Sequence, residues 1–350
     1  MSRSNETASW HDWEFLEMSC LTLCLRRWAG YLLCLLGLSG QMLHAVELQL
    51  DLPVRCDIGR DCFIQNYFDH DAGPGWQDYA CGHLAYDTHT DFRLRSMQQM
   101  LDGVEVIAAA AGTVLAVRDG EPDVSIRERP LDASNPKEAG NAVRIAHLYG
   151  WETQYSHLRQ GSVSVRPGQR VQAGDLLGLV GLSGRTEFPH VDFTVRKEGR
   201  PVDPFGPDRT VCGEPDGALW RKNVLSRLAY QSTAILVAGF AERILLTTEL
   251  QSGRAFVTEF SDQAPALVFQ AEIMGVRKGD VESVHISGPE GVVLSKFTAP
   301  IIKTLAIRQL FFGQRKPSGL WPAGEYSGYY RLERAHKVMT EFVVKVRVGG

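Results

Sequence analysis

The chain has no cluster of basic residues, no pair of cysteines spaced as C-x-x-C, and no low-complexity segment. Its 37 Lys and Arg side chains nearly balance 41 Asp and Glu, for a formal net charge of −4. Because binding to phosphates requires a basic surface, this balance argues against a nucleic acid as the partner. The cysteine spacing argues against a cysteine-rich zinc site. The chain of 350 residues is long enough for two domains, each with its own core.

The first 45 residues have the features of an export signal. Arg26 and Arg27 precede a mostly apolar run at 28–38, and residues 43–45 provide a cleavage site. The run is shorter than the about 20 apolar residues that a membrane-spanning helix needs. We therefore predict a signal peptide at 1–45, with Met18 as an alternative start, and export to the periplasm or cell envelope. An uncleaved membrane anchor is the alternative.

Four cysteines remain after the predicted signal, namely Cys56, Cys62, Cys81 and Cys212. An even number in an oxidising compartment predicts two disulfides, and four cysteines allow three pairings. We favour Cys56–Cys62, which closes a small loop, and Cys81–Cys212, which ties together the two ends of the first domain. Free buried thiols are the alternative.

The middle of the chain is typical of an all-β fold, because short apolar runs alternate with glycine and proline. A charged, proline-containing stretch at 119–139 reads as a long loop, and glycines recurring through 165–178 indicate a tight hairpin. The strands predicted in this region are 104–108, 112–118, 141–146 and 151–156.

A second domain is predicted after a boundary near 204–217. A short helix is expected within 219–236, and turn residues separate the runs that follow. Short strands with regular turns are typical of an antiparallel sandwich, here an Ig-like accessory domain for docking or scaffolding. The predicted strands are 244–248, 255–260, 266–274 and 341–348. The predicted organisation is an extension at 46–80, a first domain at 81–212 and the accessory domain at 213–350.

The segment 181–196 carries the most specific motif. After a Gly/Ser-rich turn and Pro189, His190 and Asp192 stand two residues apart on a predicted strand, so both side chains lie on one face. The motif resembles the Pro-His-x-His-Phe strand of the lysostaphin-type (LytM-like) zinc endopeptidases, which cut bacterial cell-wall peptide bridges. The hairpin at 165–178 also resembles that family. The resemblance covers about residues 80 to 206 and implies a LytM-like β-sheet, barrel-sandwich core.

In that family a His-x-x-x-Asp motif supplies two zinc ligands. Here Asp91 followed by Phe92 matches the aspartate, and His89 matches the histidine in type but precedes Asp91 by two positions instead of four. On an extended strand His89 and Asp91 still share a face. If no residues have been deleted, Asp87 takes the place of the histidine. The pair His83 and Asp87 has the family spacing, but its surroundings do not match.

The third zinc ligand of the family is the second histidine of the strand motif, and Asp192 occupies that position. Carboxylate oxygens do bind zinc, so the resemblance implies a site of His89, Asp91 and Asp192. Aspartate is shorter than histidine and makes the site more anionic, which favours harder cations. Zn²⁺ is the implied cofactor, with Mn²⁺ or loss of the metal as alternatives.

The resemblance also implies roles for other residues. His157, in a Tyr-x-His-Leu strand, and His190 match the two catalytic histidines, and Arg185 and Thr186 are candidates for substrate binding. The predicted function is that of an exported metalloendopeptidase acting on the peptide cross-links of peptidoglycan. The alternative is a catalytically degenerate domain that binds cell wall or activates a partner amidase or another envelope protein.

Overall fold

The computed structural model describes residues 48–71, 73, 75–129, 137–207, 212–291 and 293–349. The predicted signal peptide therefore lies outside the described residues. Leu48–Gly350 form one compact unit. Within the described ranges, no helix is both long and apolar enough to cross a membrane.

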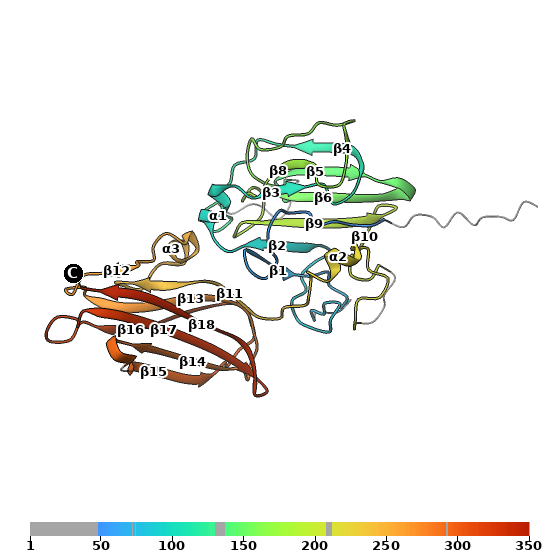
Figure 1. Ribbon diagram of the computed structural model, residues 1–350. Coiled ribbons are helices and arrows are strands. Elements are labelled where there is room, and N and C mark those ends of the chain that lie inside the picture. The colour runs from blue at the N-terminus through green and yellow to red at the C-terminus, as the bar shows by residue number, and fades with distance from the viewer. Residues whose placement is uncertain are drawn as a thin grey trace, which may run out of the picture. The chain divides into compact units, whose positions relative to one another are not determined.

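The first part of the chain forms an antiparallel sheet of eight strands (Figure 1). Its order is β1 (Cys62–Asn66), β2 (Thr90–Leu94), β9 (His190–Lys197), β6 (Trp151–Leu158), β5 (Asn141–Ala146), β4 (Gly112–Arg118) and β7 (Arg170–Val171), with β10 (Arg200–Val202) beside β9. A separate ladder pairs β3 (Glu105–Ile107) with β8 (Leu176–Leu179), and α1 (Met97–Asp102) connects β2 to β3. The strands predicted in this region are confirmed.

Strand β9 shows why this sheet can carry a site on one face. Its apolar residues Val191, Phe193 and Val195 are buried in the core. Side chains alternate along a strand, so His190 and Asp192 point to the opposite face. The alternation of apolar and polar residues thus packs the domain and presents its reactive groups together.

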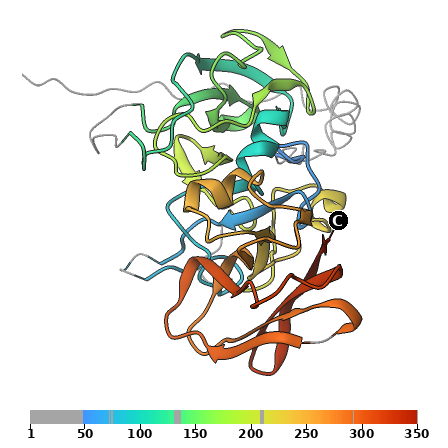
Figure 2. The same ribbon diagram turned by 90° about the vertical axis from the view of Figure 1, so that its left-hand side faces the viewer.

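The C-terminal part forms two further sheets, shown by the yellow, orange and red strands in Figure 2. One contains β11 (Ala234–Ala241), β13 (Ala266–Val276) and β16 (Leu305–Arg315); the other contains β12 (Glu259–Phe260), β18 (Lys337–Val348), β17 (Gly324–Arg334), β14 (Val281–Ser287) and β15 (Val293–Pro300). Phe240 and Phe269 from the first sheet share a core with Val284 and Tyr330 from the second. Two sheets therefore pack as a sandwich, while its Ig-like character remains a prediction.

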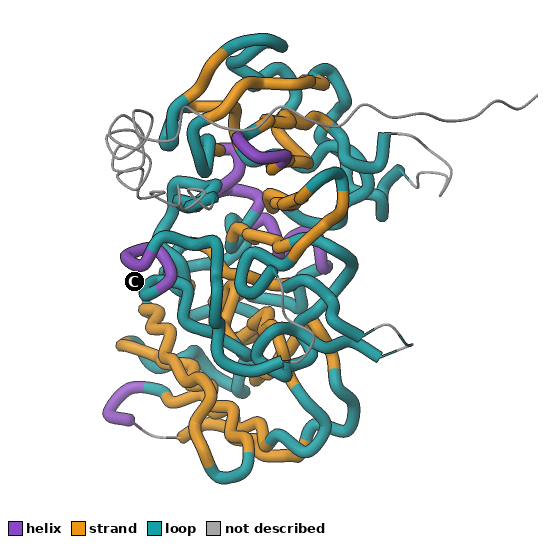
Figure 3. The backbone as a smooth tube through the Cα atoms, turned by 90° about the vertical axis from the view of Figure 1, so that its right-hand side faces the viewer, coloured by secondary structure: helices purple, strands orange, loops and turns teal. Residues whose placement is uncertain are grey.

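Among the described residues helices are few and short (Figure 3), and two predicted strands of the C-terminal part differ from the structure. The predicted strand at 244–248 is wrong, because these residues lead into helix α3 (Thr247–Ser252). The side chain of Glu249 caps the first turn by accepting from the backbone N–H of Leu246 at 2.8 Å. The predicted strand at 255–260 is formed only at β12 (Glu259–Phe260), whereas the short helix expected within 219–236 is confirmed as α2 (Lys222–Leu225).

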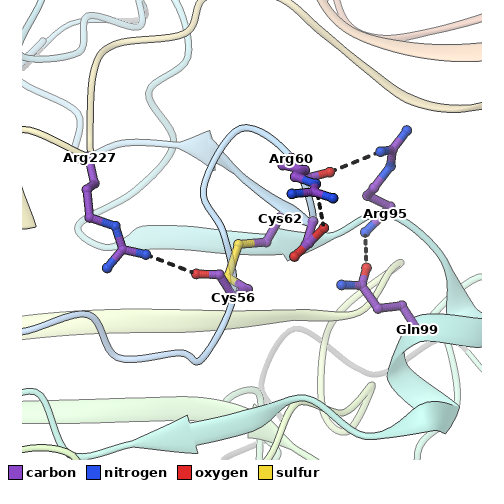
Figure 4. Close-up of a disulfide and its surroundings, with 7 residues drawn as sticks. Cys56, Arg60, Cys62, Arg95, Gln99 and Arg227 are labelled. Carbon is purple, nitrogen blue, oxygen red and sulfur yellow. Dashed lines mark hydrogen bonds and ion pairs between the residues drawn. A yellow bond between two sulfur atoms is a disulfide. The ribbon is translucent and has the colours of Figure 1, made fainter.

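Both favoured disulfides are present. Cys56 and Cys62 have Cα atoms 6.2 Å apart, and those of Cys81 and Cys212 are 5.0 Å apart. Figure 4 shows the first disulfide beside Arg227, whose Nη2 donates to the carbonyl of Cys56 at 3.5 Å. The small loop is thereby held against the segment that follows α2.

Candidate active site

A cleft of about 1240 Å³ opens on the polar face of the eight-stranded sheet. All the residues predicted for the site line it: His89, Asp91, His157, Arg185, Thr186, His190 and Asp192. They come from β2, β6, β9 and the connections that lead into β2 and β9. The fold thus gathers residues that lie up to about a hundred positions apart in the sequence.

The two acidic candidates face each other across neighbouring strands. Asp91 on β2 pairs directly with Asp192 on β9, so both side chains emerge at the same level of the sheet. His89 precedes β2 and reaches both acids: Nε2 lies 3.4 Å from Asp91 Oδ1, and Nδ1 lies 3.7 Å from Asp192 Oδ2. Burial alone would lower the pKa of His89, but the carboxylates of Asp192, Asp91 and Asp87 outweigh burial and raise it.

His190 is held by the turn that precedes β9. Its Nδ1 lies 3.0 Å from the carbonyl oxygen of Phe188 and 3.1 Å from the hydroxyl of Thr186. Burial, followed by the neighbouring His157, lowers the pKa of His190 to about 3, so the ring is neutral near pH 7. A neutral ring that donates from Nδ1 to Phe188 leaves the lone pair of Nε2 free.

His157 lies beside His190, with ring centroids 4.7 Å apart. Its Nδ1 is 2.8 Å from the carbonyl oxygen of Ser183, and its backbone N–H donates to Ala139 at 2.9 Å. The backbone of His157 has φ of 62°, a left-handed conformation that is uncommon for residues other than glycine. Strained conformations of this kind cluster at functional sites, where the surrounding structure holds them.

The two candidates for substrate binding differ in their surroundings. Arg185 is exposed and pairs with Glu138 at 2.7 Å, at the edge of the cleft. Thr186 is buried, and its hydroxyl donates to the carbonyl oxygen of Phe188 at 2.9 Å. Thr186 therefore holds the turn beneath His190, while Arg185 is available to a bound molecule.

Sequence reasoning missed three residues that support the site. Asn66 Nδ2 donates to Asp91 Oδ2 at 2.7 Å, and Thr194 Oγ1 donates to Asp192 Oδ1 at 3.0 Å. Arg93 places its guanidinium 4.0 Å from the centre of the Phe188 ring. Thr194 could have been found from the alternation along β9. Asn66 carries no local signal, because only the pairing of β1 with β2 brings it to Asp91.

Part of the chain is similar to proteins of a known family. Residues 97–204 match the model of peptidase family M23. The chain contains an M23 peptidase domain. The match includes His157, His190 and Asp192, whereas His89 and Asp91 precede it, where the sequence departs from the family motif.

Relatives of the M23 domain include the cell division protein DipM of Caulobacter vibrioides, 32% identical over 35% of this chain and 19% of that protein. The peptidoglycan DD-endopeptidase ShyB of Vibrio cholerae is 32% identical over 32% of this chain and 24% of its own length. The chain thus spans less than a quarter of these relatives. A peptidase M23 structure from Pseudomonas aeruginosa is 23% identical, with a TM-score of 0.28 over 45% of this chain and 49% of that one.

Whether the cleft suits a metal can be judged at Asp91. Its Oδ1 atom is buried and, among the described residues, has no hydrogen-bond partner. It faces Nε2 of His89 at 3.4 Å and Nε2 of His190 at 3.5 Å. A carboxylate oxygen facing the lone pair of a neutral imidazole is stabilised by a cation placed between them. Imidazole nitrogen and carboxylate oxygen are also donors that zinc accepts, so the residues fit the metal in chemical type.

The side-chain positions themselves do not form a metal site. In the part of the chain that the structure describes, no group of three or more His, Cys, Asp or Glu side chains is arranged to hold a metal ion. The two ring nitrogens of His89 point to different acids instead of converging with them on one point. A bound metal therefore requires the side chain of His89 to turn.

Proposed function

We propose that this protein is an exported, metal-dependent endopeptidase that hydrolyses peptide cross-links of bacterial peptidoglycan. The observation that carries the proposal is that His89, Asp91, Asp192, His157 and His190 line one cleft. In it Oδ1 of Asp91, which has no hydrogen-bond partner among the described residues, faces Nε2 of both His89 and His190. Relatives of the M23 domain are named as a peptidoglycan DD-endopeptidase and, in Neisseria meningitidis, as a DD-carboxypeptidase/endopeptidase. Their names support a cell-wall peptide as the substrate.

His89, Asp91 and Asp192 would hold the metal. Zinc, or manganese in this more anionic setting, would supply a Lewis acid that polarises the scissile carbonyl and acidifies water. Asn66 and Thr194 hold the two acids in place through hydrogen bonds at 2.7 and 3.0 Å. Such supporting bonds fix the orientation of ligands before the metal arrives.

His190 is suited to act as the general base. The hydrogen bond from Nδ1 to the carbonyl of Phe188 fixes the tautomer and leaves the lone pair of Nε2 free in the cleft. Nε2 can therefore accept a proton from the attacking water. His157, beside His190 in the cleft, would stabilise the negative charge that develops on the carbonyl oxygen of the substrate.

The second candidate function is that of a catalytically degenerate domain that binds cell-wall peptides or activates a partner amidase. Two observations favour it: Asp192 stands in place of a histidine ligand, and among the described side chains no three-donor group is arranged for a metal. Such a protein would use the same cleft for binding without turnover.

Metal content separates the two functions. We would purify the chain without chelator and measure metal by mass spectrometry, alongside the variants Asp192→Asn and Asp87→Asn. The proposal predicts about one zinc or manganese per chain, lost in Asp192→Asn and kept in Asp87→Asn. Asp87→Asn is a matched control, because asparagine tolerates the φ of 60° found at that position.

Loss of metal in Asp87→Asn alone would show that Asp87 is the ligand and that no residues have been deleted from the motif. No metal in any of the three proteins would favour the degenerate domain.

A further inference from the structure

The C-terminal sandwich contributes to the cleft of the M23 domain. Thr304, which precedes β16, and Ala306 within β16 line the same cleft as His89 and His190. Both residues of the sandwich are exposed. Thr304 is held in place, because its hydroxyl accepts from the backbone N–H of Lys278 at 3.0 Å. Two residues that line the cleft therefore lie about a hundred positions beyond the region that matches family M23.

A buried ion pair joins the sandwich to the strand that carries Asp91. Arg93 on β2 is 2% exposed and Glu272 on β13 is fully buried, and Arg93 Nη2 lies 2.5 Å from Glu272 Oε1. Gln251 and Gln309 each donate to the other carboxylate oxygen of Glu272 at 3.0 Å. Burying two charges is costly unless they are paired and hydrogen-bonded in this way. Glu272 thus holds the guanidinium of Arg93 in one position.

Arg93 also contacts the loop segment that holds His190, the proposed general base. Its guanidinium lies 4.0 Å from the centre of the Phe188 ring, a cation–π contact. The carbonyl of Phe188 binds Nδ1 of His190, and Arg93 itself pairs with His190 across β2 and β9. A continuous set of contacts therefore runs from Glu272 through Arg93 and Phe188 to His190.

We propose that the C-terminal sandwich is a structural part of the substrate site of the M23 domain. Glu272 acts as a positioning residue for the turn that precedes His190. Thr304 and Ala306 form a wall of the cleft, and the substrate peptide contacts this wall. The positioning role stands on geometry alone. The identity of the substrate at the wall rests on the proposed function.

The positioning role is tested by Glu272→Gln with Glu282→Gln as the matched control. Glu282 is also a buried carboxylate of the sandwich paired with an arginine, Arg308, at 2.7 Å. The readout is the side-chain NMR signal of His190 in the full chain. We expect Glu272→Gln to shift this signal and Glu282→Gln to leave it unchanged. An unshifted signal in folded Glu272→Gln would overturn the positioning role.

If Glu272→Gln does not fold, the double variant Arg93→Met with Glu272→Met serves instead. Replacing both members of a buried pair by apolar residues of similar size avoids an unpaired buried charge. The cation beneath Phe188 is lost in this variant as well, so the His190 signal is again expected to shift. An unchanged signal would contradict the proposal.

The wall is tested by the binding of an uncross-linked stem tetrapeptide, which offers no cross-link to cleave. Thr304→Arg places a bulky side chain in the cleft and is expected to weaken binding about tenfold or more, measured by calorimetry. Thr298→Arg is the control: Thr298 is an exposed threonine of the same sandwich, also with one hydroxyl contact, and does not line the cleft. Its affinity is expected to stay unchanged.

The outcomes of this experiment separate the two proposals. If the unsubstituted chain does not bind the peptide, the proposed function is overturned, and so is the proposed contact of the substrate with Thr304 and Ala306. If the unsubstituted chain binds and both threonine variants bind equally well, the wall alone is overturned. The His190 signal remains an independent test of the positioning role in either case.

Discussion

At the scale of single residues, metal binding at the site depends on the contacts that Asp192 makes with its neighbours. The acid sits directly opposite Asp91 on the neighbouring strand, and His89 reaches both. Two carboxylates in close proximity attract a positive charge, which is consistent with the raised pKa of His89. The same acids favour a metal once the ring is neutral, so a proton and a metal compete for this position.

Thr194→Val tests how far the orientation of Asp192 matters. The hydroxyl of Thr194 donates to Asp192 Oδ1 at 3.0 Å, and loss of such a supporting bond is expected to weaken metal binding about 10- to 100-fold. Affinity would be measured by competition with a coloured chelator. Thr233→Val, which removes a buried threonine hydroxyl bound to the carbonyl of Gly275, should leave metal affinity unchanged. Equal affinities in the two variants would show that Asp192 needs no such support.

At the scale of elements, the sequence predicts the strands that carry the site but not the pairing that completes it. Apolar and polar residues alternate along 141–146 and 190–196, and the sequence reveals both strands because each of them buries one face. The pairing of β1 with β2 joins segments separated by the Cys81 loop, so no local pattern reveals that Asn66 supports Asp91. Similarly, the apolar run at 244–248 gave no sign that Glu249 would cap a helix there.

The two disulfides are expected to differ in their contribution to stability. Cys81–Cys212 spans 131 positions and Cys56–Cys62 spans six. The chain-entropy model gives about 5 kcal/mol for the long loop and about 2 kcal/mol for the short one. Replacing Cys81 and Cys212 by serine should therefore lower the free energy of unfolding more than replacing Cys56 and Cys62. Denaturant titrations measure both, and a larger loss from the short loop would contradict this expectation.

At the scale of the whole molecule, the M23 domain and the sandwich share buried contacts. Leu236 of β11 and Met274 of β13 belong to the same core cluster as residues of the eight-stranded sheet. The hydroxyl of Tyr230 donates to Asp78 at 2.7 Å, and Arg93 pairs with Glu272. These contacts join the two parts into one compact unit.

We therefore expect thermal unfolding of the chain to occur as one cooperative transition. Separating the parts would expose buried apolar side chains and an unpaired buried charge, so neither should unfold long before the other. Scanning calorimetry measures the transition directly. Two well-separated transitions would show that the shared contacts are too weak to couple the parts.

The most direct test of the account is whether the protein cleaves cross-linked peptidoglycan. Purified chain would be incubated with cross-linked muropeptides and zinc or manganese, and the products identified by mass spectrometry. We predict release of uncross-linked stem peptides, at a rate that falls at least about 100-fold in His190→Ala. Cross-linked muropeptides that stay intact with every divalent metal supplied would contradict the account and leave the degenerate binding domain in its place.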